Sequence, residues 1–237
     1  MIIIITMAGL GTRFRKAGYD CPKYMIEAKG KTLFEWSLDS LKGYNSHVSK
    51  YIFVVRCEDN AGEFIHSKCR KYDINASEVV ELDAMTDGQA ATCILAMPFC
   101  SDDEEILIYN IDTYVEPYAM NYETISGDGH IPCFKAEGDH WSFVGLDDSG
   151  RAVEVREKVR ISDNCTLGAY YFASAGLYRR IYDEFYTSST DKREKYIAPM
   201  YDYMIRKGFA VTISLVDSDK VHVLGTPEEL QAFIGRG

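Results

Sequence analysis

The chain has 237 residues, of which 46% are hydrophobic and 26% are charged, and its formal net charge is −10 at pH 7. This composition is typical of a globular protein with a sizeable core, and no segment approaches the ~20 apolar residues of a membrane-spanning helix, so we expect no membrane association. We also expect no nucleic acid as a partner, because a surface with this excess of negative charge repels polyanions.

The chain begins with a short apolar strand that leads directly into a glycine-rich loop. Residues 2–5 are an unbroken isoleucine run, which predicts a strand covered on both faces of a parallel sheet. The loop that follows, Ala8-Gly9-Leu10-Gly11-Thr12-Arg13, contains two glycines that let backbone N–H groups approach a ligand. The segment through Pro22-Lys23 is predicted to be irregular, and such a long loop inside a compact domain is usually functional.

Strand and helix signals alternate up to about residue 112. Thr32 and Glu35 fit a capping box, and the apolar spacing after them predicts a helix over 33–42. The other elements predicted in this half are strands at 50–56, 77–82 and 105–109, a helix at 60–72 starting from Asn60, and a helix to residue 97 capped by Thr86 and Asp87. Four strand-then-helix units in about 110 residues imply a mostly parallel sheet with right-handed crossovers.

The pattern changes beyond residue 125, where short strands dominate and indicate a mixed or antiparallel arrangement. The elements predicted here are strands at 130–136, 141–146, 152–158, 167–172 and 209–216, a turn at 147–150, and helices at 176–185, 195–206 and 228–234, the last capped by Thr226. We therefore predict an α/β fold. Its Rossmann-like, mostly parallel or mixed central sheet would carry helices on both faces, in one domain over residues 1–237 whose halves divide near residue 125.

The first loop has the composition of a nucleoside triphosphate site. A strand followed by Gly-x-Gly and clustered cations offers backbone donors for phosphate oxygens and fixed positive charge for a departing pyrophosphate. The loop contains neither GxxxxGK[ST] nor the third glycine of GxGxxG. A plain strand-to-helix turn is the alternative interpretation of the glycines alone.

The longer run is more specific. Met7-Ala8-Gly9-Leu10-Gly11-Thr12-Arg13-Phe14, followed by Pro22-Lys23-Tyr24-Met25, resembles the signature of the sugar-phosphate nucleotidyltransferases, which make nucleoside-diphosphate sugars and related compounds. The resemblance implies the nucleotide-diphospho-sugar transferase type of fold. It also implies that Ala8, Gly9, Gly11 and Thr12 bind the triphosphate, that Arg13 stabilises the α-phosphate and the leaving pyrophosphate, and that Lys23 neutralises phosphate oxygens.

Later stretches resemble the same family. In residues 86–91, Gly88 and Gln89 would flank the base, although a helix start with a solvated glutamine gives the same pattern. Asp112 follows the strand at 105–109, at the sheet edge where open α/β sheets bind ligands, and would hold Mg²⁺ unless it only caps a turn. The resemblance assigns Glu157, Lys158 and Gly168 to the acceptor side, and a solvated strand edge is the alternative for the Glu-Lys pair.

The segment Gly225-Thr226-Pro227-Glu228 also matches the family, and here the chain departs from it. Many members have an aspartate two residues before that glycine as a second metal ligand, whereas this chain has Val223. Because valine cannot bind Mg²⁺, either Asp217 or Asp219 would supply the carboxylate, or water molecules would complete the coordination.

The resemblance implies an enzyme that joins an NTP to a phosphorylated acceptor such as a sugar 1-phosphate, releases pyrophosphate and uses Mg²⁺. Residues 1–125 would form the nucleotide-binding half and residues 126–237 the acceptor-binding half. The segment at Gly88-Gln89 resembles that of pyrimidine users, which favours CTP or UTP/dTTP. The alternatives are a metal-dependent glycosyltransferase of the same fold and a non-catalytic nucleotide-binding protein. The oligomeric state stays open, a homodimer included.

Other chemistries are not indicated. The seven cysteines are scattered, with no CxxC pair and no Cys/His cluster at the spacing of a metal site, so we expect reduced thiols and a cytoplasmic protein. The five histidines show no HExxH spacing, and no GxSxG motif suggests a covalent nucleophile.

Overall fold

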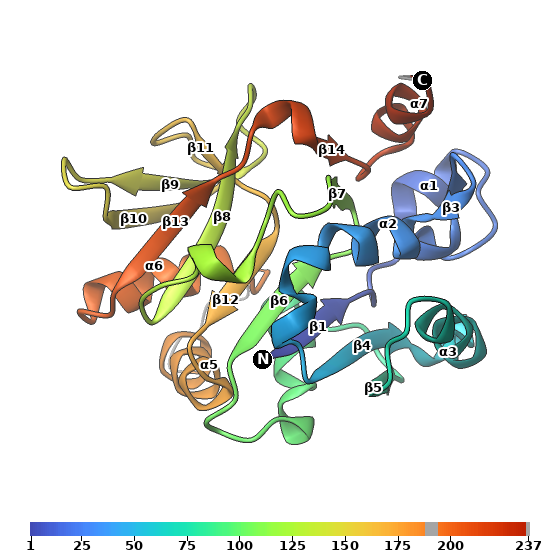
Figure 1. The fold of residues 1–237 in the computed structure, drawn as a ribbon, viewed down its shortest axis with the longest axis horizontal. Coiled ribbons are helices and arrows are strands. Elements are labelled where there is room, and N and C mark those ends of the chain that lie inside the picture. The colour runs from blue at the N-terminus through green and yellow to red at the C-terminus, as the bar shows by residue number, and fades with distance from the viewer. Residues whose placement is uncertain (188–193, 236–237) are drawn as a thin grey trace.

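The computed structural model describes residues 1–187 and 194–235, and within them ten strands form one mixed sheet. These strands are β1 (Ile2–Thr6), β4 (Lys50–Arg56), β5 (Ser77–Leu82), β6 (Ile106–Asn110), β8 (Gly129–Lys135), β9 (Ser142–Leu146), β10 (Ala152–Glu157), β11 (Asn164–Thr166), β12 (Ala169–Phe172) and β13 (Val211–Leu215). Their order is β10-β9-β11-β8-β12-β6-β1-β4-β5, with β13 beside β8 (Figure 1).

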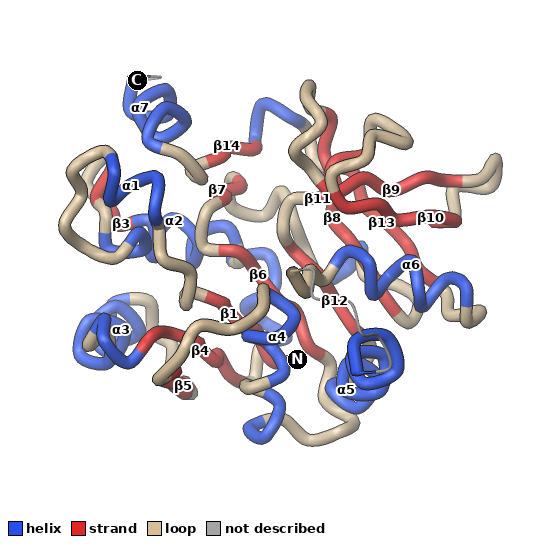
Figure 2. The backbone as a smooth tube through the Cα atoms, turned by 180° about the vertical axis from the view of Figure 1, so that it is seen from behind, coloured by secondary structure: helices blue, strands red, loops and turns tan. Residues whose placement is uncertain are grey.

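Helices cover both faces of this sheet. The helices are α1 (Thr12–Lys16), α2 (Leu33–Ser40), α3 (Gly62–Lys71), α4 (Gln89–Ile94), α5 (Ala175–Tyr182), α6 (Ala198–Arg206) and α7 (Pro227–Gly235). Those that pack on the sheet are α2 to α6, whereas the buried residues of α1 and α7 belong to a separate small core. The side chains of β1 alternate between the two faces: Ile2 and Ile4 belong to the core with α4, α5 and α6, and Ile3 and Ile5 to the core with α2 and α3. Figure 2 shows α4, α5 and α6 on the side facing the viewer. None of the helices among the described residues is both long and apolar enough to cross a bilayer.

The two halves of the chain meet inside the sheet. In the first half, β1 is parallel to β4 and β6, and β4 is parallel to β5. In the second half, β12 is antiparallel to both β6 and β8, and β9 is antiparallel to β10. The predicted mixed sheet is therefore confirmed, and the change of pattern expected near residue 125 corresponds to a change from parallel to mostly antiparallel pairing, with β13 parallel to β8 as the exception.

Several local predictions agree closely with the structure. β4 and β5 have the predicted bounds. The capping box at the start of α2 is complete: Glu35 N–H donates to Thr32 Oγ1 at 3.3 Å, and Thr32 N–H donates to Glu35 Oε2 at 2.9 Å. At the C-terminal end, Glu229 N–H donates to Thr226 Oγ1 at 3.2 Å, so Thr226 caps α7 as predicted.

The predicted caps of α4 are wrong, and a long-range contact explains why. α4 begins after Gly88, which has φ +130°, and no side chain of the described residues caps it. The Lys195 N–H instead donates to Asp87 O at 2.6 Å, and Ala90 N–H donates to Lys195 O at 2.9 Å. The same pairing delays α6, predicted from residue 195, to Ala198. α3 likewise starts at Gly62, since Asn60 adopts a left-handed conformation with φ +48°.

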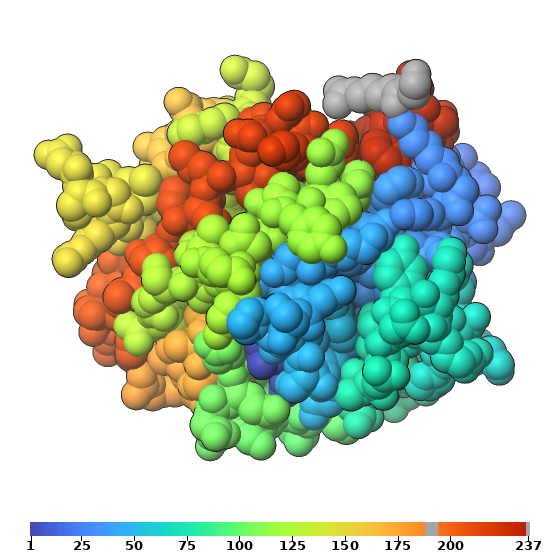
Figure 3. Space-filling model, in the orientation of Figure 1, coloured from blue at the N-terminus to red at the C-terminus, as the bar shows by residue number. Residues whose placement is uncertain are grey.

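Two pairs of short strands are missing from the sequence prediction. They are β2 (Glu27–Ala28) with β3 (Lys31–Thr32), and β7 (Thr113–Val115) with β14 (Val221–Val223). The second pair brings the C-terminal segment beside the end of β6, where Leu224 N–H donates to Asp112 O at 2.8 Å. α7 then packs through Leu230 and Phe233 against a core that includes Phe14. Figure 3 shows this C-terminal segment, in red, against the blue N-terminal residues.

Candidate active site

A cleft of about 1080 Å³ lies at the carboxyl ends of β1 and β6, whose last residues Thr6 and Asn110 are paired neighbours. The cleft extends to residues at the ends of β9, β10 and β12. Of the residues predicted from the sequence, it is lined by Ala8, Gly9, Gly11, Thr12, Arg13, Lys23, Gly88, Gln89, Asp112, Glu157, Lys158 and Gly168. Asp217 and Asp219 do not line it. Both are exposed, and Asp217 pairs with Lys220 at 3.1 Å.

The glycine-rich loop places the start of α1 at one end of the cleft. Gly11 is the residue before the helix, has φ +59°, and provides no side-chain cap. The first N–H groups of a helix have no acceptor within the helix, so those at the start of α1 are left for solvent or a ligand. Arg13 lies in this first turn with an exposed side chain, and Gly11 packs close to Lys23, since a Cβ on Gly11 would lie 3.5 Å from Lys23 Cβ.

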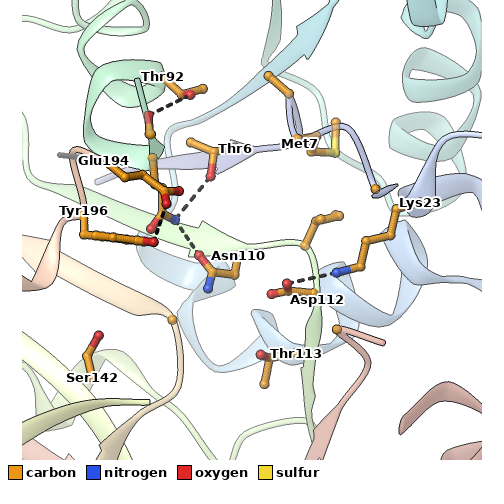
Figure 4. A pocket seen from close by; sticks show the side chains of 18 of the residues that line it. Thr6, Met7, Lys23, Thr92, Asn110, Asp112, Thr113, Ser142, Glu194 and Tyr196 are labelled. Carbon is orange, nitrogen blue, oxygen red and sulfur yellow. Dashed lines mark hydrogen bonds and ion pairs between the residues drawn. The ribbon is translucent and has the colours of Figure 1, made fainter. Parts of the chain in front are cut away.

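Lys23 and Asp112 form an ion pair across the cleft floor, with 2.9 Å between Nζ and Oδ2 (Figure 4). Burial alone would raise the pKa of Asp112, but the Lys23 ammonium, with a smaller contribution from Arg13, holds that pKa below its usual value. Lys23 is positioned by its neighbour Tyr24, which is buried and donates to Asp59 Oδ2 at 3.0 Å. The site therefore contains an ionised carboxylate beside a fixed cation.

Gln89 connects the ends of the two central strands. Its Nε2 donates to Thr6 Oγ1 at 3.2 Å and to Asn110 Oδ1 (Figure 4). Gly168 packs against the same amide: it has φ +78°, and a Cβ there would lie 2.1 Å from Asn110 Nδ2. Both the backbone conformation and the close approach require glycine at this position.

The side of the cleft formed by the ends of β9 and β10 carries a second fixed cation. Glu157 ends β10 and accepts from the Ser142 hydroxyl, and Lys158 follows with a left-handed φ of +55°. Lys158 Nζ donates to Tyr196 Oη at 2.7 Å and lies 3.4 Å from Glu157 Oε1. Burial alone would lower the pKa of Lys158, but Tyr196 and Glu157 raise it, so the amine is charged. Figure 4 shows Tyr196 and Ser142 across the cleft from Lys23.

The C-terminal segment completes the cleft near Asp112 with Val223, Gly225 and Glu229. Glu229 Oε2 is buried and has no hydrogen-bond partner among the described residues. Within the same residues, no group of three or more His, Cys, Asp or Glu side chains is placed to hold a metal ion. A divalent cation in this cleft would therefore depend on one or two carboxylates together with substrate oxygens.

The comparisons with known proteins agree with this geometry. The solved structure of the nucleoside-diphosphate-sugar pyrophosphorylase from Vibrio cholerae RC9 is 32% identical and has a TM-score of 0.89, and the match covers 100% of both chains. The chain belongs to the sugar-phosphate nucleotidyltransferase family. The inositol-1-phosphate CTP transferase from T. maritima is 16% identical with a TM-score of 0.78, and the match covers 100% of this chain and 96% of that one. At that identity the likeness concerns the fold alone.

The comparison with curated sequences matches a smaller part of this nucleotidyltransferase than the comparison with solved structures does. A probable UDP-N-acetylglucosamine pyrophosphorylase from Encephalitozoon cuniculi is 36% identical over 63 residues, which are 25% of this chain and 18% of that protein. The chain thus matches less than a fifth of the length of this curated relative. No family model matches the chain.

Four residues of this nucleotidyltransferase cleft were not singled out from the sequence. Asn110 was not predicted, although its position directly after the predicted strand at 105–109 was the available signal. Ser142 and Tyr196 gave no signal, because their place in the cleft depends on contacts with Glu157 and Lys158. Glu229 was passed over beside Glu228, although its spacing from Thr226 was visible.

Proposed function

We propose that this chain transfers a nucleotidyl group from an NTP to a phosphorylated acceptor, with a sugar 1-phosphate as the first candidate. An oxygen of the acceptor phosphate attacks the α-phosphorus in line, the bond from that phosphorus to the β-phosphate oxygen breaks, and pyrophosphate leaves. One observation carries the proposal: a single cleft holds the glycine-rich loop, Lys23 and Asp112 on one side and Glu157 and Lys158 on the other. Such a reaction needs alignment and charge stabilisation rather than a protein nucleophile.

We assign each group of residues a role according to its position in the cleft. The loop from Ala8 to Thr12 offers backbone N–H groups to the triphosphate, with Gly88 and Gln89 on the nucleotide side. Arg13 and Lys23 stabilise negative charge that develops on the α-phosphate and the pyrophosphate. On the acceptor side, Lys158 binds the phosphate, Glu157 accepts hydrogen bonds from hydroxyl groups, and Gly168 lines the acceptor pocket beside Asn110.

Asp112 suits the Mg²⁺ that this chemistry uses. Its carboxylate is held in the ionised form, and the oxygen that contacts Lys23 lies at the cleft. Bound there, Mg²⁺ supplies positive charge to the phosphate oxygens.

The same proposal includes the roles of the two halves of the chain, the choice of nucleotide, the compartment and the oligomeric state. Residues 1–125 form the nucleotide-binding half and residues 126–237 the acceptor-binding half of one domain. The resemblance of the Gly88-Gln89 segment to pyrimidine users supports CTP or UTP/dTTP as the nucleotide. The seven cysteines, all free thiols in the structure, are compatible with work in the cytoplasm, and a homodimer is the oligomer to test first.

The test is a screen of four NTPs against a panel of phosphate monoesters for release of pyrophosphate. With the active pair, Arg13→Ala should lower kcat by about 10²–10³-fold, the effect of removing one oxyanion donor. Arg15→Ala is the matched control, because Arg15 lies on the same helix and does not line the cleft. Lys23→Ala and Lys16→Ala form a second such pair.

Unaltered pyrophosphate release by Arg13→Ala or Lys23→Ala would refute the assignment. Binding of a nucleotide without any exchange of labelled pyrophosphate into it would instead identify a non-catalytic binding protein. Transfer of a sugar from a nucleoside-diphosphate sugar, without use of an NTP, would identify a glycosyltransferase.

A further inference from the structure

One carboxylate oxygen in the cleft is left without a partner. Glu229 Oε2 is buried and makes no hydrogen bond within the described part of the chain. A buried carboxylate oxygen is costly unless a donor or a cation compensates for its lost hydration. Because Glu229 lines the cleft, such a compensating group can come from a ligand.

The local sequence would place the Glu229 side chain elsewhere. Thr226 and Glu229 have the spacing of a capping box, as Thr32 and Glu35 do at the start of α2. At α2 both bonds form, whereas at α7 only Glu229 N–H donates to Thr226 Oγ1. Among the described residues, no bond runs from Thr226 N–H back to the Glu229 carboxylate, so this side chain does not cap its own helix.

The geometry around Gly225 brings this carboxylate to Asp112. A Cβ on Gly225 would lie 3.2 Å from Glu229 Oε2 and 3.7 Å from Asp112 Oδ2. The two oxygens therefore flank the same small space beside a residue that has no side chain. Asp112 Oδ2 is also the oxygen that contacts the Lys23 ammonium, so the group has two carboxylates and one cation.

From this arrangement we propose that Glu229 supplies the second carboxylate of the magnesium site, opposite Asp112. The inference rests on the proposed function and assigns a ligand that Val223 cannot provide. Asp217 and Asp219 are exposed and outside the cleft, whereas Glu229 lies within it. Mg²⁺ is commonly held by one or two carboxylates plus substrate phosphates, and two carboxylates with Lys23 leave a net negative charge for it to neutralise.

Binding of Mn²⁺ alone, followed by the paramagnetic resonance of the free ion, tests this without knowledge of the substrates. Glu229→Gln keeps the shape and removes the charge, and it should weaken Mn²⁺ binding by at least about tenfold. Glu228→Gln is the matched control, because Glu228 is the preceding residue of α7 and is exposed. This control should bind Mn²⁺ as the wild type does, and Asp112→Asn should show a loss at least as large as Glu229→Gln.

Thermal unfolding in the presence of a chelator separates a ligand from a structural residue. Without metal, Glu229→Gln should melt at the same temperature as the wild type or higher, because the amide replaces a carboxylate whose Oε2 atom is buried without a hydrogen-bond partner among the described residues. Added Mg²⁺ should raise the melting temperature of the wild type and of Glu228→Gln more than that of Glu229→Gln.

Equal Mn²⁺ affinity in the wild type and Glu229→Gln would overturn the inference. It would also be overturned if Glu229→Gln melted at a lower temperature than the wild type under chelation and if Mg²⁺ raised the melting temperatures of both proteins equally. Pyrophosphate release by the wild type would leave the proposed function standing in either case. The proposed function fails separately, when the wild type releases no pyrophosphate from any NTP and acceptor in the screen.

Discussion

Replacing Gly168 with alanine tests how the centre of the cleft is held together. Alanine at φ +78° costs about 1–2 kcal/mol in backbone conformation. Its Cβ would also lie 2.1 Å from Asn110 Nδ2, so the Asn110 side chain has to move. That movement breaks the hydrogen bond from Gln89, worth about 1 kcal/mol, and we expect Gly168→Ala to lower the free energy of unfolding by about 2–4 kcal/mol.

Gly150→Ala is the matched control for the backbone cost. Gly150 has φ +81°, and nothing lies within 4 Å of a Cβ placed there. Gly150→Ala should lower the free energy of unfolding by only about 1–2 kcal/mol, so the difference between the two variants isolates the contact with Asn110. Urea denaturation measures both values. Activity should fall in Gly168→Ala alone, because Gln89 and Asn110 line the cleft and the 147–150 turn does not.

A double variant sharpens this test. In an Asn110→Ala background, most of the extra cost of Gly168→Ala should disappear, since the colliding amide is gone. Equal destabilisation by Gly168→Ala and Gly150→Ala would show that the close approach to Asn110 is not important. The same conclusion would follow if the two substitutions at 110 and 168 were simply additive.

Two further predictions concern the acceptor side and the acid stability. Lys158→Ala should raise the KM for the acceptor by about 10–100-fold and change the KM for the NTP little, because a charge-assisted bond to phosphate is worth about 1.5–3 kcal/mol. Arg156→Ala is the control in steady-state kinetics, because the Arg156 guanidinium pairs with Glu154. Equal KM changes in the two variants would contradict the role of Lys158. Burial alone would raise the pKa of Glu35, but hydrogen bonds from Lys68, Lys71 and Thr32 lower it to about 2. Its contribution to stability is therefore present above its ordinary pKa near 4.5 and is lost as the pH falls toward 2. Glu35→Gln should remove up to about 2 kcal/mol of that acid dependence in urea unfolding from neutral pH to about pH 3, and an unchanged acid dependence would refute the attribution.

The fold was predictable where a local signal and the tertiary structure agree. β4 and β5 follow from their apolar β-branched runs, and α2 follows from a capping box that the structure completes. The start of α4 was not predictable, because the backbone of Lys195, about a hundred residues away, takes the position that the Thr86 and Asp87 caps would have filled. β7 and β14 have three residues each, too few for any periodicity to show.

The candidate site divides in the same way. The glycine-rich loop and Pro22-Lys23 are contiguous motifs, and a single sequence is enough to notice them. Tyr196 lies in the cleft, where Lys158 contacts it, and no spacing of residues along the sequence predicts that contact. Glu229 was hidden by its own pattern: the T-x-x-E spacing favours a cap, and only the structure shows that its carboxylate is directed elsewhere.

The direct pairing of β6 with β12 has a consequence for how the substrates are aligned. β6 leads to Asp112, and Gly168 immediately precedes β12, where Ala169 is paired with Tyr109. Asn110 N–H also donates to Gly168 O at 3.0 Å. The distance from Asp112 to Gly168 across the cleft is thus set by the hydrogen bonds of two directly paired strands and not by a flexible connection between two domains. That distance is established once, when the chain folds, and side chains along the rim of the cleft can vary without changing it.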